Sequence, residues 1–283
     1  MRRKVVIGDI EIGDNKPIPF IAEIGVNHLG SIDKAIEMVD KSIEAGSDFL
    51  KFQTYEASKR YEKSNPKYGE FTKLLTEWQL SKEDEKKLWK YAKGKKARVF
   101  TSVYDEDSVD FALELGTLAF KVAAFELTNK KLIKKIITTS LPVIISCGMT
   151  NIEEIKKTTH ILDQSKIDYI LLHTVSSYPL MEQDSFLSKI NLLKENFNCP
   201  VGHSDHTHGT NIPPLAAAAG AQIIEKHFTV NPKYRLSDNF FSVTCDQVKK
   251  IKFDLDNVFK IMYSPNFEKN NPEKFMKDFK KFS

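Results

Sequence analysis

The chain has 283 residues, of which 41% are hydrophobic and 28% charged, a composition typical of a globular domain. Its 42 basic and 38 acidic side chains give a net charge of only +4, and the lysines are scattered rather than gathered in one stripe. This balance argues against a nucleic-acid-binding protein, and we expect no nucleic-acid partner.

Cysteine usage and the apolar segments predict the compartment. Cys147, Cys199 and Cys245 are far apart and odd in number, which favours reduced thiols over a disulfide framework. No apolar run approaches the ~20 residues needed to cross a bilayer. The basic start MRRKVVIGDIEIGDN lacks the long apolar core and the cleavage site of a signal peptide. We therefore expect a cytoplasmic protein that has no membrane partner.

The chain opens with a short hairpin and a first strand–helix unit. Residues 1–15 alternate around two Gly-Asp turn signals, which predicts an N-terminal β-hairpin. The segment IPFIAEIGVN over 18–27 predicts a strand whose end carries Glu23 and Asn27. Apolar residues then recur at helical spacing over 31–46, so a helix is expected to follow this strand.

The same alternation of strand and helix continues along the chain. Further strand-like runs cover residues 49–55, 98–104, 118–127, 142–149, 169–176, 200–206 and 222–229. Each has a helix-like partner, and the strands are apolar on both faces, as parallel strands beneath helices must be. Eight such units predict a (β/α)8 TIM barrel, an α/β fold, over residues 16–264. No GxGxxG or P-loop sequence occurs, which weakens the alternative of a doubly wound nucleotide-binding sheet.

Two segments depart from this alternation of strands and helices. Residues 56–79 form a long, aromatic-rich insertion after the second barrel strand. On the catalytic face of a barrel it would act as a lid, and the alternative is an ordinary packed excursion. The basic C-terminal tail, 265–283, carries Phe275, Phe279 and Phe282 at helical spacing, which is consistent with a docked terminal helix.

Polar residues mark the C-terminal ends of the predicted barrel strands. Because these ends converge on one cavity in a TIM barrel, we interpret them as a single site. Lys51 and Lys121 lie inside apolar strands and are costly to bury without an anionic partner. Together with hydroxyl groups on other strand ends, they predict a pocket for a phosphorylated or carboxylated small molecule.

Two of the strands end on histidines, His206 and His227, and three carboxylates are close in sequence: Asp205, Glu225 and Asp238. Imidazole and carboxylate are common ligands of divalent transition metals, so the pair predicts a metal site. Two protein ligands would leave positions open for water and substrate, as a catalytic ion requires. His203 and His208 are weaker candidates for ligands.

Several segments occur in a characteristic order and spacing: AEIGVNHLG, KFQTY, FKVAAFE, SCGM, LLHTVSSYP, GHSDHTHG and EKHFT. Over roughly residues 15–250 they resemble the sialic acid synthase family, which includes N-acetylneuraminate, pseudaminic acid and legionaminic acid synthases. The resemblance implies a homodimeric transferase that condenses phosphoenolpyruvate with an N-acylated amino-sugar aldehyde to give a nonulosonic acid and phosphate. Phe125-Glu126 and the DNFFS segment favour pseudaminic acid over neuraminate as the product.

The resemblance implies catalytic roles for Glu23, Glu126, His206 and His227. The two histidines match the ligands of a Mn²⁺ or Mg²⁺ ion. Glu23 matches a sugar contact and is a candidate base, whereas Glu126 matches a second acidic residue at the reacting end. In such a reaction C3 of phosphoenolpyruvate attacks the polarised aldehyde, water adds at C2, and phosphate leaves.

The resemblance also implies a set of substrate-binding residues, which comprises Lys51, Gln53, Ser102, Lys121, Ser146, Ser176, Tyr178, Ser204 and Asp238. The lysines match phosphoenolpyruvate contacts and Ser102, Ser146 and Ser204 match phosphate contacts. Gln53, Tyr178 and Asp238 match sugar contacts. Two positions depart from the pattern, because Ser176 stands where some members have asparagine, and Ala123-Ala124 where members usually carry a serine. One phosphate or carboxylate contact is therefore expected to be missing.

The family usually continues into a small C-terminal antifreeze-like domain that reaches the partner subunit's site and supplies a sugar-contacting arginine. This sequence ends at Ser283, about where the linker would begin, so we expect that domain to be absent, either naturally or by truncation. Two alternative functions stay open. One is a non-catalytic anion-binding barrel, and the other is a different phosphoenolpyruvate-dependent enzyme that condenses a phosphorylated aldose.

Overall fold

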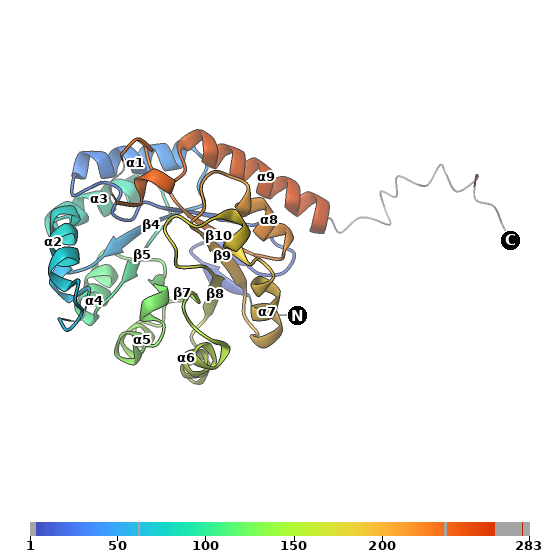
Figure 1. Ribbon diagram of the computed structural model, residues 1–283, viewed down its shortest axis with the longest axis horizontal. Helices are drawn as coiled ribbons and strands as arrows, with labels where there is room; N and C mark the ends of the chain where they lie inside the picture. The colour runs from blue at the N-terminus through green and yellow to red at the C-terminus, as the bar shows by residue number, and fades with distance from the viewer. Residues whose placement is uncertain (1–3, 62, 235–236, 264–278, 280–283) are drawn as a thin grey trace.

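A closed barrel of eight parallel strands forms the centre of the computed structural model, which describes residues 4–61, 63–234, 237–263 and 279 (Figure 1). The strands are β3 (Phe20–Glu23), β4 (Phe49–Thr54), β5 (Val99–Val103), β6 (Phe120–Val122), β7 (Val143–Ser146), β8 (Tyr169–His173), β9 (Val201–Asp205) and β10 (Ile224–His227). They pair in chain order, and β10 closes the barrel against β3. The predicted TIM barrel is confirmed.

Helices surround the barrel (Figure 1). They are α1 (Ile32–Glu44), α3 (Lys82–Gly94), α4 (Glu106–Glu114), α5 (Lys130–Ile137), α6 (Ile152–Gln164), α7 (Lys189–Asn196), α8 (Ile212–Ala218) and α9 (Cys245–Tyr263). Several begin at a side chain that accepts a hydrogen bond from the first helical turn, as Ser31, Ser81 and Asp105 do. Their apolar faces and the outer faces of the strands form one continuous core that includes Trp89 and Tyr169.

The barrel interior has an apolar layer at one end and a polar layer at the other. The predicted hairpin, β1 (Val5–Ile7) and β2 (Ile10–Ile12), is confirmed and packs against the apolar layer. That layer includes Ile21, Phe49 and Phe100. Because side chains alternate along a strand, the residues two positions further on also face inward, at the carboxyl end. These residues are Glu23, Lys51 and Ser102, so the alternation itself places polar groups at the barrel mouth.

The insertion after β4 is more ordered than the predicted polar loop. It contains the 3-10 helix η1 (Ala57–Lys59) and the helix α2 (Tyr68–Trp78). The Tyr55 hydroxyl donates to the Leu75 carbonyl at 3.1 Å, and Leu75 and Trp78 pack on a small cluster formed by Tyr55 and its neighbours. These contacts favour the packed excursion over a detached lid.

The predicted strand over 118–127 and the predicted C-terminal helix have different outcomes. The strand predicted over 118–127 is wrong in its second half, because Ala124–Glu126 form the 3-10 helix η2 after β6 ends at Val122. The predicted tail helix lies outside the described residues except for Phe279. Within the described ranges, no helix combines the length and the hydropathy that crossing a membrane requires. Two short helices complete the fold, η3 (Glu182–Ser185) and η4 (Ser237–Phe241).

Candidate active site

Two lysines and two glutamates meet at the centre of the barrel mouth. We call Glu23, Lys51, Lys121 and Glu225 the ionic floor. Lys51 Nζ lies 2.6 Å from Glu23 Oε2 and 3.5 Å from Glu225 Oε1, and Lys121 Nζ lies 3.3 Å from Glu225 Oε1. All four side chains are buried. The apolar strands can hold these charges because each has an opposite charge within reach.

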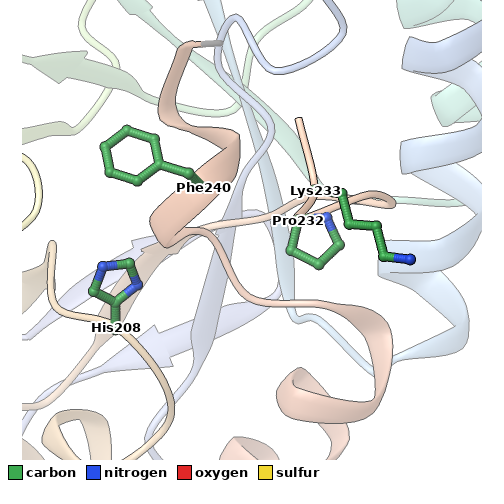
Figure 2. Close-up of a pocket in the computed structure, with 4 residues that line it drawn as sticks. All are labelled: His208, Pro232, Lys233 and Phe240. Carbon is green, nitrogen blue, oxygen red and sulfur yellow. The ribbon is translucent and has the colours of Figure 1, made fainter. Parts of the chain in front are cut away.

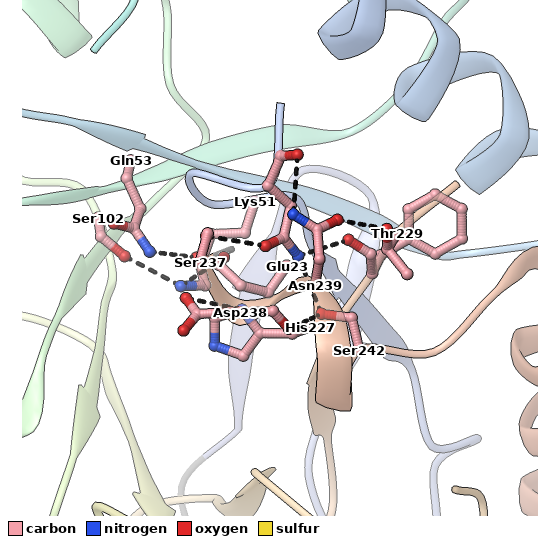
Figure 3. A network of polar contacts seen from close by, with 12 residues as sticks. Glu23, Lys51, Gln53, Ser102, His227, Thr229, Ser237, Asp238, Asn239 and Ser242 are labelled. Carbon is pink, nitrogen blue, oxygen red and sulfur yellow. Dashed lines mark hydrogen bonds and ion pairs between the residues drawn. The ribbon is translucent and has the colours of Figure 1, made fainter. Parts of the chain in front are cut away.

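Hydroxyl and amide groups predicted as substrate contacts bond to this ionic floor. Figure 3 shows two of them, Ser102 and Gln53, beside Lys51 and Glu23. Three serines bond to it, Ser102 accepting from Lys51 at 3.0 Å, Ser146 accepting from Lys121 at 2.7 Å, and Ser204 donating to Glu225 at 3.1 Å. Gln53 Nε2 donates to Glu23 Oε1 at 2.7 Å. The structure thus brings together residues from β3, β4, β5, β6, β7, β9 and β10, as their shared strand-end position predicts.

The members of the ionic floor differ in their charge states. Burial raises the pKa of Glu23 to about 7, although Lys51 opposes this shift. Burial also acts to raise the pKa of Glu225, but Lys121 and Lys51 outweigh it and hold the pKa below its ordinary value. Burial lowers the pKa of Lys121, whereas at Lys51 the two glutamates overcome burial and raise the pKa. Glu225 therefore carries the negative charge, and Glu23 is the member closest to protonation at neutral pH.

The two predicted metal-binding histidines lie above the ionic floor. His227 ends β10, His206 directly follows β9, and their ring centroids are 5.7 Å apart. Burial lowers the pKa of His206 to about 4 and that of His227 well below its ordinary value, so both rings are neutral at pH 7. His206 Nδ1 lies 2.9 Å from the Val175 carbonyl, which assigns the proton to Nδ1 and leaves the Nε2 lone pair free. Tyr178 packs on His206 with its ring centroid at 4.2 Å.

Asp238 reaches the site from η4. Its carboxylate lies 3.6 Å from His227 Nδ1. Figure 3 shows the two side chains facing each other. Burial raises the pKa of Asp238 to about 6, and the positive charges of Arg60 and Lys51 oppose that rise. The η4 segment is tied to the loop after β3, because the Asn27 side chain donates to Ser242 Oγ at 2.9 Å and accepts from Ser237 Oγ at 3.1 Å. This anchoring fixes the position of Asp238 beside the histidines.

Two predicted residues lie at the edge of this group. The Ser176 hydroxyl oxygen is buried and has no hydrogen-bond partner. It lies close to Gly148, where an added Cβ would come within 2.6 Å of it, so a larger residue at that position would displace the Ser176 side chain. Glu126 lies in η2, where its carboxylate accepts a hydrogen bond from the Asn129 side chain at 2.7 Å.

The residues between the inward-facing ones point out of the barrel. Lys226 Nζ lies 2.5 Å from Asp205 Oδ2 and 2.6 Å from the Thr207 carbonyl, and both charged side chains are fully buried. His203 also faces away from the mouth, with its Nδ1 3.0 Å from the His173 carbonyl oxygen. Neither Asp205 nor His203 is therefore placed to complete a metal site with His206.

Two residues at the site escaped the sequence-based assignment. Glu225 was considered only as a carboxylate close in sequence to the two histidines, although its period-two relation to His227 predicts that both face inward. Arg60, in the insertion after η1, is buried at the mouth, and no periodic pattern in the sequence marks it.

The histidine pair is a candidate metal site with two protein ligands. Among residues 4–61, 63–234 and 237–263, no group of three or more His, Cys, Asp or Glu side chains is arranged to hold an ion. The protein donors would therefore be two neutral imidazoles, one of them oriented by a backbone carbonyl in the manner common for metal-ligating histidines. His227 Nδ1 is buried without a hydrogen-bond partner, and Asp238 Oδ2 lies 3.6 Å from it, beyond hydrogen-bond distance.

A separate cavity of about 610 Å³ opens beyond η4, lined by His208, Pro232, Lys233 and Phe240 (Figure 2). Phe240 faces this cavity, whereas Phe241 packs against His227 with ring centroids 5.2 Å apart. The 3-10 helix η4 thus has one aromatic side chain on each side. None of the ionic floor lines this cavity, so we place the chemistry at the barrel mouth.

Comparison with known proteins adds a consistent set of similarities. A sequence model of the NeuB family matches residues 38–266. The N,N'-diacetyllegionaminic acid synthase of Legionella pneumophila is 35% identical over 246 residues, which cover 82% of this chain and 69% of the relative. The pseudaminic acid synthase of Campylobacter jejuni is 30% identical over 83% of this chain and 72% of its own length. The crystal structure of N-acetylneuraminic acid synthetase from Leptospira borgpetersenii, in complex with citrate, has a TM-score of 0.92 at 32% identity and covers 99% of this chain and 96% of that chain.

Proposed function

The chain belongs to the NeuB family, and we propose that it condenses phosphoenolpyruvate with an N-acylated amino-sugar aldehyde to give a nonulosonic acid and phosphate. It is a transferase of the nonulosonic acid synthase class, as its similarity to the legionaminic and pseudaminic acid synthases supports. The narrower expectation of a pseudaminic acid product rests on Phe125-Glu126 and residues 238–242, and it stays a prediction.

The ionic floor is the observation that carries this proposal. Phosphoenolpyruvate has a carboxylate and a phosphate, and Lys51 and Lys121 present two ammonium groups, each already bonded to a serine hydroxyl. Substrate oxygens can accept hydrogen bonds from these groups, whose positive charges are already buried in the free protein. The Ser176 hydroxyl has no hydrogen-bond partner and can donate to a substrate oxygen, whereas the buried Oε2 of Glu225 needs a donor, which a hydroxyl of the amino sugar can supply.

Glu23 is the residue we assign to proton transfer. Its carboxylate is held by Lys51 and Gln53, and its pKa of about 7 lets it take up and release a proton near neutral pH. C3 of phosphoenolpyruvate forms the new carbon–carbon bond to the aldehyde carbon, whose oxygen takes up a proton. Water adds at C2 and gives a proton to Glu23, and the C2–O bond to phosphate then breaks. One water is consumed, and the electrons balance without an oxidant.

A divalent ion is proposed as the cofactor, with His206 and His227 as its protein ligands. When bound there, Mn²⁺ or Mg²⁺ would supply a Lewis acid that polarises the aldehyde oxygen. Asp238 would orient His227 from the other side, since its carboxylate lies 3.6 Å from the Nδ1 atom.

The test is phosphate release with phosphoenolpyruvate, Mn²⁺ and one of three acceptors: N-acetylmannosamine and the two diacetamido-trideoxyhexoses. We expect release with at least one acceptor, together with a product whose mass equals the sum of the substrates and water minus phosphate. In H₂¹⁸O the released phosphate should carry no label, because the C2–O bond breaks and the bridging oxygen leaves with phosphorus. Phosphate that appears equally without an acceptor, or no release with any acceptor, would contradict the proposal.

A further inference from the structure

Arg60 is a buried cation at the wall of the barrel mouth. Its side chain is only 9% exposed, and its guanidinium carbon lies 3.2 Å from the ring centroid of Tyr104 and 4.7 Å from that of Phe125. The two rings are nearly parallel, 7° apart, with centroids separated by 6.0 Å. The guanidinium therefore lies over the face of Tyr104 with the ring of Phe125 beside it, and these aromatic contacts hold the cation at the wall of the mouth.

Two nitrogens of this guanidinium are without a hydrogen-bond partner in the described part of the chain. Nε and Nη1 are buried and make no hydrogen bond within the residues that the structure describes. No carboxylate in those residues forms an ion pair with Arg60 either, although its charge is felt at Asp238 across the mouth. Because an unpaired buried charge is costly, such a group is expected to meet an acceptor when the site is filled.

The neighbours of Arg60 place it beside the substrate-binding groups. Tyr104 directly follows β5, two residues after Ser102, whose hydroxyl is bonded to Lys51. Phe125 directly follows Ala123-Ala124, where the family resemblance leads us to expect a serine. The ionic floor contains two lysines and two glutamates and is balanced in charge, whereas Arg60 adds a positive charge at the mouth that no carboxylate of the described residues neutralises at ion-pair distance.

We propose that Arg60 binds an oxyanion of a substrate, a phosphate or a carboxylate group, at the mouth of the barrel. The planar fork of a guanidinium matches the spacing of two oxygens in either group, and the charge assists both hydrogen bonds. Two substrates can supply this chemistry: phosphoenolpyruvate itself, and an aldose acceptor that carries a phosphate. The choice between these sources rests on the proposed function, but the presence of an oxyanion site does not.

Binding measurements on matched variants test the inference. Calorimetry would compare Arg60→Met and Arg60→Lys with the unaltered protein for phosphoenolpyruvate, inorganic phosphate, N-acetylmannosamine and N-acetylmannosamine 6-phosphate. The control is Lys59→Met, because Lys59 is the adjacent residue, is exposed, and is paired with Asp107 at the surface. We expect Arg60→Met to weaken binding of at least one anion tenfold or more, Arg60→Lys to recover part of it, and Lys59→Met to match the unaltered protein.

The set of ligands that lose affinity in Arg60→Met identifies which substrate supplies the oxyanion. A loss confined to phosphoenolpyruvate and phosphate assigns the substrate oxyanion, and a loss confined to the phosphorylated sugar assigns the acceptor. Unchanged affinities for all anions in Arg60→Met, with a native circular dichroism spectrum, overturn the inference even if the melting temperature falls. If inorganic phosphate binds through Arg60 but no acceptor gives product, the proposed function fails and this inference stands. If Arg60→Met forms product with unchanged KM for both substrates, this inference fails and the function stands.

Discussion

Glu23 and Glu225 share a side chain and face the same barrel interior, yet their neighbours give them different charge states. Glu225 lies within reach of both lysines, so their fields hold it ionised. Glu23 has one close lysine and the unfavourable field of Glu225, so burial dominates and raises its pKa to about 7. Glu225 is thus a fixed anion, whereas Glu23 is a group that titrates near neutral pH.

The titration of Glu23 should appear in the pH dependence of catalysis. If Glu23 takes the proton from water, its ionised form is the active one. The kcat/KM for phosphoenolpyruvate should then rise with pH through about 7 and level off above it, because kcat/KM reports groups of the free enzyme. Glu23→Gln should lower kcat by about 10²-fold or more and remove this rise. A flat profile between pH 6 and 8 in the unaltered protein would count against the assignment.

The histidines allow a prediction with an internal control. His206→Ala and His227→Ala should each abolish metal-dependent turnover while the circular dichroism spectrum stays native, since each removes one of two protein ligands. His208→Ala should be mild, because His208 lies in the neighbouring cavity. A chelator should remove activity and Mn²⁺ restore it. Full activity after chelation, or equal damage from His208→Ala, would exclude this metal site.

The sequence pattern predicts the position of some site residues and not of others. The residues of the ionic floor lie on regular strands, so a period of two and the common carboxyl end suffice to place Glu23, Lys51 and Lys121 together. Arg60 lies on an irregular insertion, where no period links position to direction. Its place depends on the packing of Tyr104 and Phe125, which come from other parts of the chain. Such contacts follow from the fold and cannot be derived from local pattern.

At the scale of elements, the ends of β9 and β10 are joined by the buried ion pair of Lys226 and Asp205. Each of these residues directly precedes one of the two histidines, and Lys226 also bonds the Thr207 carbonyl on the far side of His206. The pair therefore fixes the backbone on both sides of one histidine to the strand that carries the other. It holds the spacing of the two rings from outside the barrel.

Removal of one partner of the buried Lys226–Asp205 ion pair should destabilise the protein. Lys226→Met leaves the Asp205 carboxylate buried without a countercharge, and the free energy of unfolding should fall by about 3–5 kcal/mol. The double variant with Asp205→Leu should regain part of the loss, because it leaves no unpaired charge. Urea unfolding measures both. Lys250→Met, at an exposed lysine paired with Asp254, is the control and should change little. Equal stability of the single and double variants would show that the unpaired charge is not the cause.

Helices and strands were predicted well where buried apolar residues follow a regular pattern along the sequence. They were predicted poorly in the irregular segments. All eight barrel strands were predicted, because each is apolar on both faces and bounded by turn signals. The error at 118–127 arose because Ala124 and Leu127 are buried as a strand residue would be, while the backbone has already turned into η2. The helix α2 was missed although Phe71, Leu75 and Trp78 recur at helical spacing, because it lies outside the regular alternation of strands and helices and buries no residue fully.

At the scale of the whole molecule, stability and chemistry are located at opposite ends of the barrel. The hairpin residue Ile7 is fully buried against the apolar layer, far along the strands from the mouth. Ile7→Ala should lower the free energy of unfolding by about 2–5 kcal/mol and leave KM for phosphoenolpyruvate unchanged. Val6→Ala is the matched control, since Val6 lies on the same strand and is 53% exposed. A changed KM in Ile7→Ala would mean that the two ends are coupled.

The closure of the barrel by β10 against β3 has a consequence for how the protein reaches its working state. In that seam His227 is paired with Glu23, so the first and last barrel strands meet at the reacting centre. More than 200 residues separate these two strands. Contacts between such distant segments form late in folding, because the chain loses the entropy of closing a long loop before the stabilising contacts are made. During synthesis on the ribosome, most of the chain can therefore gain helices and strands while the centre does not yet exist. In refolding, far-UV dichroism should recover first, and the ability to bind substrate should be the last property to return.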